Sequence, residues 1–215
     1  MAEWAIIDQV TTTKKAAPKK AAPPSERRAH LIRLAADLFA EKGFRATTVR
    51  EIADAAGILS GSLYHHFDSK ESIGEEILRE FLDDVLGGYR EATAGSDDPR
   101  LAIERMVRSS TAALSRHRAA LTMLQNDWAY FSAQKRFAYL RTAMKEIEQT
   151  WVDQLERGKR SGQFRADLDA RLIYRLLRDI LWIPTSWKQA RGKSWTTDEI
   201  VNGLLHLLFV GISAP

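Results

Sequence analysis

One stretch constrains the fold of this chain more than any other: residues 47–70, TTVREIADAAGILSGSLYHHFDSK. Thr48 is followed three residues later by Glu51, which is the spacing of a capping box at a helix start. Gly57 comes after a compact apolar run, and glycine takes the positive φ of a sharp turn at little cost. Residues 59–65 then predict a second short helix. These features favour a helix-turn-helix, which places one helix in the major groove of DNA, over an ordinary helical hairpin.

The same motif resembles the DNA-binding signature of a known family. TTVREIADAAG followed by GSLYHHFDSKE is similar to the signature of the TetR family of transcriptional repressors, and the likeness runs from about Glu26 to Leu82. The resemblance implies an all-helical homodimer with an N-terminal DNA-binding domain and a larger ligand-binding and dimerisation domain. We therefore expect a disordered basic arm (1–24), a helix-turn-helix domain (25–70) and a ligand-binding and dimerisation domain (71–215).

Composition argues against several other classes of protein. The 215 residues are 45% hydrophobic and 28% charged, as in a soluble globular protein. No apolar run is long enough to span a membrane, and the N-terminus lacks the apolar stretch of a signal peptide, so we expect a cytoplasmic protein. Cysteine is absent, and the five histidines lack metal-ligand spacing. We therefore expect no enzyme, no metal site and no cofactor.

The positive charge is concentrated in the N-terminal third. Residues 1–70 hold eleven Lys or Arg and eight Asp or Glu, within a chain of net charge +4. The run TTTKKAAPKKAAPP at 11–24 has too little apolar surface to fold alone. A basic arm beside a DNA-reading motif suggests contact with phosphates that is independent of sequence. The alternative is a solvated tail without a role.

The second helix of the motif is expected to read bases. Ser60, Gly61 and Ser62 are small, so the backbone can come close to the groove floor, and Leu59 can pack on a thymine methyl group. The sequence therefore predicts direct base readout by residues 59–62.

Flanking groups in such a motif bind phosphates. The resemblance implies phosphate contacts from Thr47, Thr48, Tyr64, His65 and Lys70. We add Arg45 and Arg50 as groove or phosphate contacts because they are basic and lie beside the motif. His65 and His66 are neighbours that do not share a helix face, so they do not predict a metal site.

The rest of the chain has helical periodicity throughout, without strand-like alternation. We predict an all-α protein of about nine helices. The expected helices beyond the motif are 25–42, 69–91, 100–116, 119–131, 136–156, 168–189 and 197–212. Asp68 with Glu71, and Thr196 with Glu199, have the spacing of helix caps, and Gly158 and Gly162 are expected to close the helix before them.

One helix in the C-terminal part has the properties of a sensor. Tyr174, Arg178 and Trp182 lie at i, i+4 and i+8 and therefore form one stripe. Arg178 lies in a strongly apolar stretch, where an unpaired charge is costly, so it needs an anionic partner. That partner is either an acidic ligand bound by the guanidinium fork or an internal carboxylate. The internal candidates are Asp127, Glu148 and Asp179, although Asp179 is also expected to pair with Arg175.

A closer resemblance sharpens this hypothesis. The segments RATTVREIADAAGILSGSLYHHF and WVDQLERGKRSGQFRADLDARLIYRLLRD, with Trp182, resemble the branch of the TetR family that represses cholesterol catabolism in actinobacteria. The resemblance implies that Arg178 and Trp182 bind an acyl-CoA thioester derived from the steroid rings, and that binding releases the operator DNA. Tyr174 and Trp128 are further candidates for the ligand site. The alternatives are another hydrophobic ligand, such as a fatty acyl-CoA or a drug, and a constitutive DNA-architectural protein.

Two apolar helix faces near the C-terminus predict a homodimer. The first face is formed by Leu172, Leu176, Ile183 and Trp187, and the second by Ile200, Leu204, Leu207, Leu208 and Gly211. Two such helices from each subunit can form a four-helix interface, and the dimer would then read a palindromic operator. The alternative is that both faces belong to an intrachain core.

Overall fold

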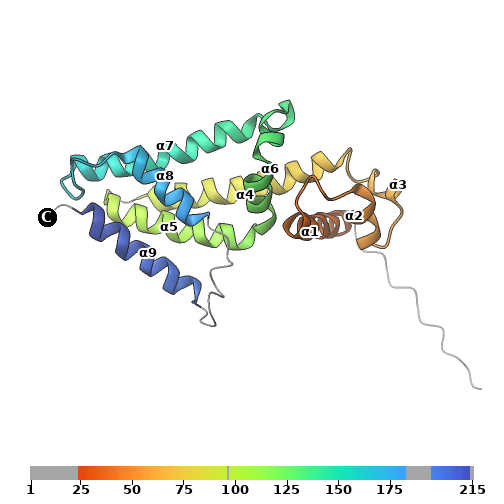
Figure 1. Cartoon of the computed structure of the whole chain (residues 1–215), viewed down its shortest axis with the longest axis horizontal. Helices are drawn as coiled ribbons and strands as arrows, with labels where there is room; N and C mark the ends of the chain where they lie inside the picture. The colour runs from red at the N-terminus through yellow and green to blue at the C-terminus, as the bar shows by residue number, and fades with distance from the viewer. Residues whose placement is uncertain (1–23, 96, 183–194, 214–215) are drawn as a thin grey trace, which may run out of the picture.

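The computed structural model describes residues 24–95, 97–182 and 195–213, and within these ranges the chain is helical (Figure 1). The prediction of an all-α protein is confirmed. The described elements are α1 (Pro24–Lys42), α2 (Val49–Ala55), α3 (Ser60–Leu63), α4 (Lys70–Thr93), α5 (Pro99–Arg116), α6 (Arg118–Ser132), the 3₁₀ helix η1 (Lys135–Phe137), α7 (Tyr139–Arg160), α8 (Ala170–Leu181) and α9 (Thr197–Ile212).

The first three helices form a small unit at one end of the molecule, on the right in Figure 1. Its core is made of side chains that are almost fully buried: Phe39, Phe44, Ile52 and Leu63. The capping box predicted at Thr48 and Glu51 is present and begins α2. Gly57 has a φ of 65°, so the turn between α2 and α3 uses the left-handed conformation that glycine tolerates.

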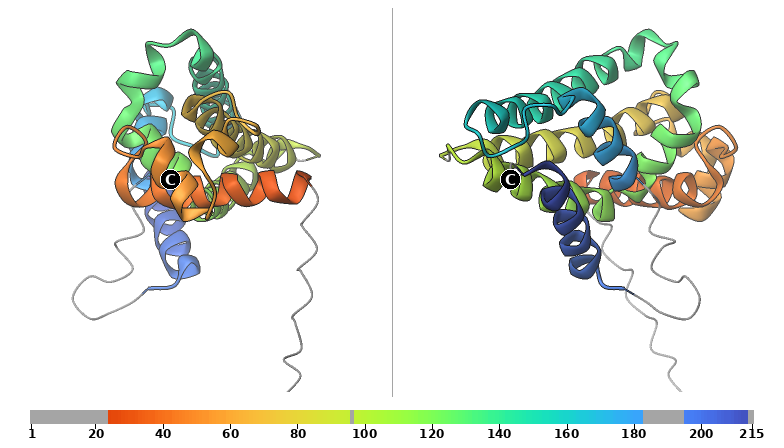
Figure 2. Two further views of the ribbon diagram at one scale, coloured as in Figure 1. Left: turned by 90° about the vertical axis from the view of Figure 1, so that its right-hand side faces the viewer. Right: turned by 60° about the vertical axis from the view of Figure 1, so that its left-hand side comes forward.

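The long helix α4 connects this unit to the C-terminal helices, as the right-hand view of Figure 2 shows. The cap of α4 differs from the prediction. Ser69 and Ser72 form the capping box, in which the main-chain N–H of each residue donates to the hydroxyl of the other, and Asp68 does not take part. Gly74 in α4 lies where a Cβ atom would come within 2.8 Å of the Phe44 ring and 3.2 Å of Met123 in α6. The absence of a side chain therefore lets the N-terminal unit, α4 and α6 share one core.

The C-terminal helices α5 and α7 pack against α4, whereas α8 packs against α7 and α5, and α9 packs against α5. Trp151 of α7 is fully buried and meets Tyr89 of α4 edge to face, with 5.9 Å between ring centroids. Gly158 was predicted to close α7, but the helix continues to Arg160. Gly158 instead leaves room for Phe164, whose ring would lie 2.0 Å from an added Cβ atom.

The helix predicted at 168–189 is described only as α8, which ends at Leu181. Ile183 and Trp187 of the predicted dimer face lie outside the described residues, as does the predicted basic arm up to residue 23. The cap predicted at Thr196 and Glu199 is present at the start of α9.

Candidate DNA-reading surface and effector cavity

The helix α3 has one face turned inward and one turned to solvent. Leu63 and Phe67 are buried on the inner side. Leu59 is 80% exposed, Tyr64 is also exposed, and Gly61 lies at the surface beside them. A large apolar side chain with so little cover does not stabilise the core, so it is available to a partner. Of the other predicted contacts in this segment, Ser60 and Ser62 are half-buried and His65 is exposed.

The start of α2 presents basic and hydroxyl groups beside α3. Thr48 is exposed and caps α2. The Arg50 side chain is 84% exposed and lies 3.7 Å from the Asp54 carboxylate, which is a loose pair. Arg45 is exposed, and its guanidinium lies 5.9 Å from the centroid of the Tyr130 ring. These positions are compatible with the predicted contacts to DNA.

Two other predicted phosphate contacts are turned inward. Thr47 is fully buried, and its hydroxyl donates to the carbonyl oxygen of Gly43 at 2.8 Å. The Nζ atom of Lys70 donates to the carbonyl oxygens of Phe44 and Thr47. The structure therefore does not place either side chain at the DNA-reading surface, because each satisfies main-chain carbonyls of the loop before α2.

Charge also stabilises the junction of α1 and α2. Lys42, at the end of α1, donates to the Glu51 carboxylate at 2.7 Å, and Thr48 donates to the same carboxylate through its main chain and its hydroxyl. These hydrogen bonds, that of Lys42 above all, lower the pKa of Glu51 to about 2. Glu51 thus both completes the capping box of α2 and links α2 to Lys42 of α1.

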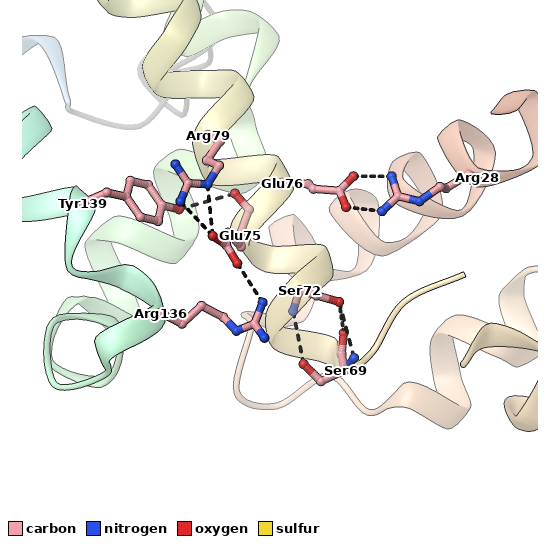
Figure 3. A network of polar contacts seen from close by, with 8 residues as sticks. All are labelled: Arg28, Ser69, Ser72, Glu75, Glu76, Arg79, Arg136 and Tyr139. Carbon is pink, nitrogen blue, oxygen red and sulfur yellow. Dashed lines mark hydrogen bonds and ion pairs between the residues drawn. The ribbon is translucent and has the colours of Figure 1, made fainter. Parts of the chain in front are cut away.

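A polar network joins the first turns of α4 to its neighbours (Figure 3). Glu76 pairs with Arg28 of α1 through both carboxylate oxygens. Glu75 pairs with Arg79 one turn further along α4 and with Arg136 of η1, the latter at 2.7 Å. The start of α4 is therefore connected both to the DNA-reading unit and to the turn between α6 and α7.

The C-terminal half of α6 contacts the same region. Tyr130 donates to the Glu71 carboxylate at 2.8 Å, and Phe131 packs on Phe44 with 4.9 Å between ring centroids. A displacement of α4 or α6 would therefore change the contacts of the helix-turn-helix core at Phe44 directly.

A small cavity of about 30 Å³ lies between α4, α5, α7 and α8. It brings together three of the four residues predicted for the ligand site: Tyr174, Arg178 and Trp182. Burial raises the pKa of Tyr174 to about 12. The remaining residues that line the cavity are mostly apolar or aromatic: Phe81, Val85, Tyr89, Ser110, Leu114, Met144, Ile147, Trp151 and Leu181.

Arg178 has an internal partner in this structure. Its Nε and Nη2 atoms donate to one oxygen of Asp179, at 2.8 Å and 2.7 Å. Asp179 thus pairs with its neighbour in sequence and not with Arg175 as predicted. The Arg178 side chain is 41% exposed, so the guanidinium lies at the mouth of the cavity and is not a fully buried charge.

Trp128 is the predicted ligand residue that the structure places elsewhere. It lies on α6, is 38% exposed and is not part of the cavity lining. The preceding residue, Asp127, has non-helical dihedral angles (φ −121°, ψ 17°) that shift the phase of the helix. The sequence pattern of α6 contains no signal of that irregularity, so the sequence could not show that Trp128 lies outside the cavity lining.

The sequence reasoning missed the cavity residues contributed by α4, α5 and α7. Most are ordinary core residues in pattern, so nothing in the sequence separates them from the rest of the core. Ser110 is the exception, because it is a polar residue on an apolar helix face. It is buried, its Oγ atom is 2.7 Å from the hydroxyl of Tyr89, and it lines the cavity.

The comparisons with known proteins agree with this architecture. Residues 31–77 match the profile of bacterial regulatory proteins of the tetR family, and residues 96–212 match the tetracyclin repressor-like C-terminal domain. The chain therefore belongs to the TetR family and is a ligand-responsive transcriptional repressor with a DNA-binding helix-turn-helix, as its relatives are. These relatives are regulators of transcription and not enzymes.

Within the family, the chain is similar to one particular repressor. The HTH-type transcriptional repressor KstR2 of Rhodococcus jostii is 46% identical over 191 residues, which cover 89% of this chain and 93% of that protein. The structure of the ketosteroid transcriptional regulator KstR2 of Mycobacterium tuberculosis superposes with a TM-score of 0.81 at 40% identity, covering 88% of this chain and 96% of that one.

A more distant structure shares the fold. AibR in complex with isovaleryl coenzyme A and operator DNA superposes with a TM-score of 0.71 at 18% identity, covering 85% of this chain and 98% of that one. None of the helices in the described part of our chain combines the length and hydropathy that crossing a bilayer requires.

Proposed function

We propose that this chain is a homodimeric repressor that binds a palindromic operator and is released from it by an acyl-CoA thioester derived from steroid rings. The main support is the 46% identity to KstR2 over 89% of the chain. A relative at 40% identity is described as a ketosteroid transcriptional regulator. The domain limits expected from the sequence, 25–70 for DNA binding and 71–215 for ligand binding and dimerisation, are part of this proposal.

The chemistry of the cavity fits an anionic ligand with an apolar portion. Arg178 can exchange the Asp179 carboxylate for a carbonyl or phosphate oxygen of the ligand, since the pair lies near solvent. Trp182 and Tyr174 provide apolar walls with polar edges on the same cavity. The fold neighbour AibR was solved with isovaleryl coenzyme A and operator DNA, which supports the acyl-CoA class of effector.

The cavity is too small for the proposed ligand, so ligand binding requires the surrounding helices to move. A cavity of about 30 Å³ holds roughly two water molecules, whereas ligand pockets usually measure about 300–1,000 Å³. The effector must therefore bind a state in which α8 has moved away from α4, α5 and α7. It shifts the equilibrium only by its differential affinity for that open state.

The helix α4 carries this change toward DNA. Phe81, Val85 and Tyr89 of α4 line the cavity, and the same helix begins at the DNA-reading unit. In a two-fold dimer, a displacement of α4 alters the spacing of the two recognition helices and thus the fit to operator half-sites. The proposed contacts to DNA are Arg45, Thr48, Arg50, Leu59, Ser60, Gly61, Ser62, Tyr64 and His65.

Fluorescence anisotropy tests this function directly. The full chain is titrated into labelled DNA from the region upstream of its own gene, and four compounds are then added separately. These are a steroid-ring acyl-CoA, its free acid, CoA alone and a long-chain fatty acyl-CoA. Release by the steroid-ring thioester alone supports the proposal. Release by the fatty acyl-CoA alone would favour the alternative effector, and tight binding unaffected by all four would contradict an acyl-CoA-responsive repressor.

A further inference from the structure

The first residue of α4 is a lysine whose ammonium lies inside the N-terminal unit. Nζ of Lys70 is 2.8 Å from the carbonyl oxygen of Phe44, 2.7 Å from that of Thr47 and 3.4 Å from that of Arg45. An ammonium has three N–H donors and no acceptor, so these carbonyls can use its whole donor capacity. All three belong to the loop between α1 and α2, where the main chain is not helical.

The surroundings of this ammonium fix its position. Nζ lies 4.5 Å from the centroid of the Phe44 ring, a cation–π distance. Phe44 is itself fully buried and packs between Phe39 and Phe131, each at 4.9 Å between ring centroids. Burial also lowers the pKa of Lys70, as expected for an ammonium removed from water. The side chain thus closes one side of an aromatic cluster and is held against the loop between α1 and α2.

We propose that Lys70 is a positioning residue for DNA binding. Its ammonium and the carbonyl oxygens of Phe44 and Thr47, which we call the lysine clasp, fasten the loop before α2 to the N-terminus of α4. The capping residue Thr48 follows Thr47 directly, so the clasp sets where α2 begins and how α3 is presented. Lys70 therefore acts on DNA through the main chain and not by touching a phosphate.

The clasp also links the DNA-reading unit to the effector cavity, and this part of the inference rests on the proposed function. Between Lys70 and Phe81, the first cavity residue on α4, the helix rises about 16 Å at 1.5 Å per residue. A helix is stiff over that distance, so a shift at the cavity reaches the clasp. The loop and α2 then follow α4 because the ammonium holds their carbonyls.

The salt dependence of DNA binding distinguishes a positioning residue from a phosphate contact. Each phosphate contact contributes about 0.9 to the slope of log K against log salt concentration. We expect Lys70→Met to weaken operator binding at least tenfold while leaving the slope unchanged. Arg33→Met, which removes an exposed charge from α1, measures the general effect of losing one positive charge. A Lys70→Met slope that falls by about 0.9 relative to this control would overturn the proposal.

A second variant decides the question if Lys70→Met does not fold, as judged by circular dichroism. Lys70→Arg keeps the charge and gains donors, and arginine binds phosphates at least as well as lysine does. A phosphate contact therefore predicts affinity within twofold of the original protein. The clasp predicts at least a fivefold loss, because a planar guanidinium does not fit the three carbonyls under the Phe44 ring.

The link to the effector is tested separately. We expect calorimetry to show that the steroid-ring thioester binds Lys70→Met and the original protein with the same affinity. The factor by which the thioester weakens operator binding should, however, be at least fivefold smaller in Lys70→Met than in the original protein. An unchanged effect on operator binding would overturn the link. If the original protein is not released by any thioester, the proposed function fails, whereas the salt slopes still decide whether Lys70 positions the loop.

Discussion

At the scale of single residues, the pair of Arg178 and Asp179 is the feature that matters most for sensing. The guanidinium lies at the mouth of the cavity and already binds one carboxylate. A ligand anion must therefore compete with Asp179 for the same donors. This competition provides a simple way in which an effector could separate α8 from its present contacts.

Replacing this arginine should affect sensing and leave DNA binding intact. In Arg178→Met we expect operator affinity within twofold of the original, since the residue lies on α8, far along the chain from α3. The thioester concentration for half-release should rise at least tenfold, because a charge-assisted bond to the ligand is lost. The matched control is Arg175→Met on the same helix, which removes an exposed charge outside the cavity. An equal effect in both variants would contradict a ligand contact by Arg178.

The carboxylate of Glu51 should make the DNA-reading unit sensitive to acid. Its pKa is lowered from 4.5 to about 2 in the folded protein, so its contribution to stability is complete above pH 4.5. That contribution is lost as the pH falls from about 4.5 to about 2. Glu51→Gln keeps a side chain suited to the capping box and removes the charge that Lys42 binds.

We therefore expect Glu51→Gln to be less stable than the original near pH 7, with a difference that shrinks toward pH 2. Urea unfolding at a series of pH values, followed by circular dichroism, measures this difference. A difference that stays constant across the range would show that the charge of Glu51 is not what stabilises the junction of α1 and α2.

At the scale of elements, the junction of α7 with α9 depends on one glycine. Gly158 lets Phe164 lie against α7, and the following residue, Arg165, donates its main-chain N–H to the Ile212 carbonyl at 2.9 Å. The Phe164 ring is buried and stacks on Phe209 with 6.5 Å between centroids. The close approach at Gly158 thus fastens the end of α9 to the rest of the C-terminal domain.

We expect Gly158→Ala to lower the free energy of unfolding by about 1–3 kcal/mol, because overpacking a buried ring costs about that much. The control is Gly87→Ala in α4, where an added Cβ meets no atom within 4 Å. That variant should be neutral or more stable by up to about 1 kcal/mol, as alanine favours helices. Chemical denaturation of both variants checks the prediction, and two equal values would contradict the steric argument.

The elements show which features can be predicted from the sequence and which cannot. The turn at Gly57 and the caps at Thr48 and Thr196 are local, so residue type and spacing suffice to predict them. The role of Gly158 depends on a residue from the following loop, and the exposure of Trp128 depends on an irregular backbone angle. Such features arise from packing between segments, which periodicity does not encode.

The same distinction applies to the effector cavity. Tyr174, Arg178 and Trp182 share a helix stripe, so the sequence alone predicts that they lie together. The stripe does not reveal which other helices face it, and only the structure adds Phe81 and Ser110. The partner of Arg178 could likewise not be chosen among three carboxylates before their positions were known.

At the scale of the whole molecule, α8 has two different faces. Tyr174, Arg178 and Trp182 face the cavity. Leu172, Leu176 and Ile180 lie at i, i+4 and i+8 on another face and are all exposed in the single chain. A helix with apolar residues on both faces is explained if the second face is covered by a partner. A homodimer would therefore bury α8 between the effector cavity and the subunit interface.

The last helix supports the same conclusion and corrects part of the prediction. Leu207 and Leu208 were both assigned to the dimer face, but Leu208 is buried within the chain, whereas Leu207 is 75% exposed. Val210 is exposed beside it, at 70%. Among the described residues of this face, the alternative of an intrachain core thus holds for Leu208 and in part for Leu204, which is half-buried and packs against the core. The exposed part of α9 stays available for a second copy.

We expect Leu172→Glu combined with Leu207→Glu to yield a monomer, because two charges would be buried without partners in the interface. The monomer carries one helix-turn-helix and should bind the operator at least a hundredfold more weakly, since the second half-site no longer adds to the affinity. Sedimentation velocity and anisotropy measure the two effects.

The matched control separates assembly from DNA reading. Leu59→Ser changes an equally exposed leucine, but on α3 at the proposed DNA surface. This variant should stay dimeric and lose operator affinity. If instead the double variant remains dimeric, the exposed faces of α8 and α9 are not the interface, and the two-fold arrangement of recognition helices must arise from another surface.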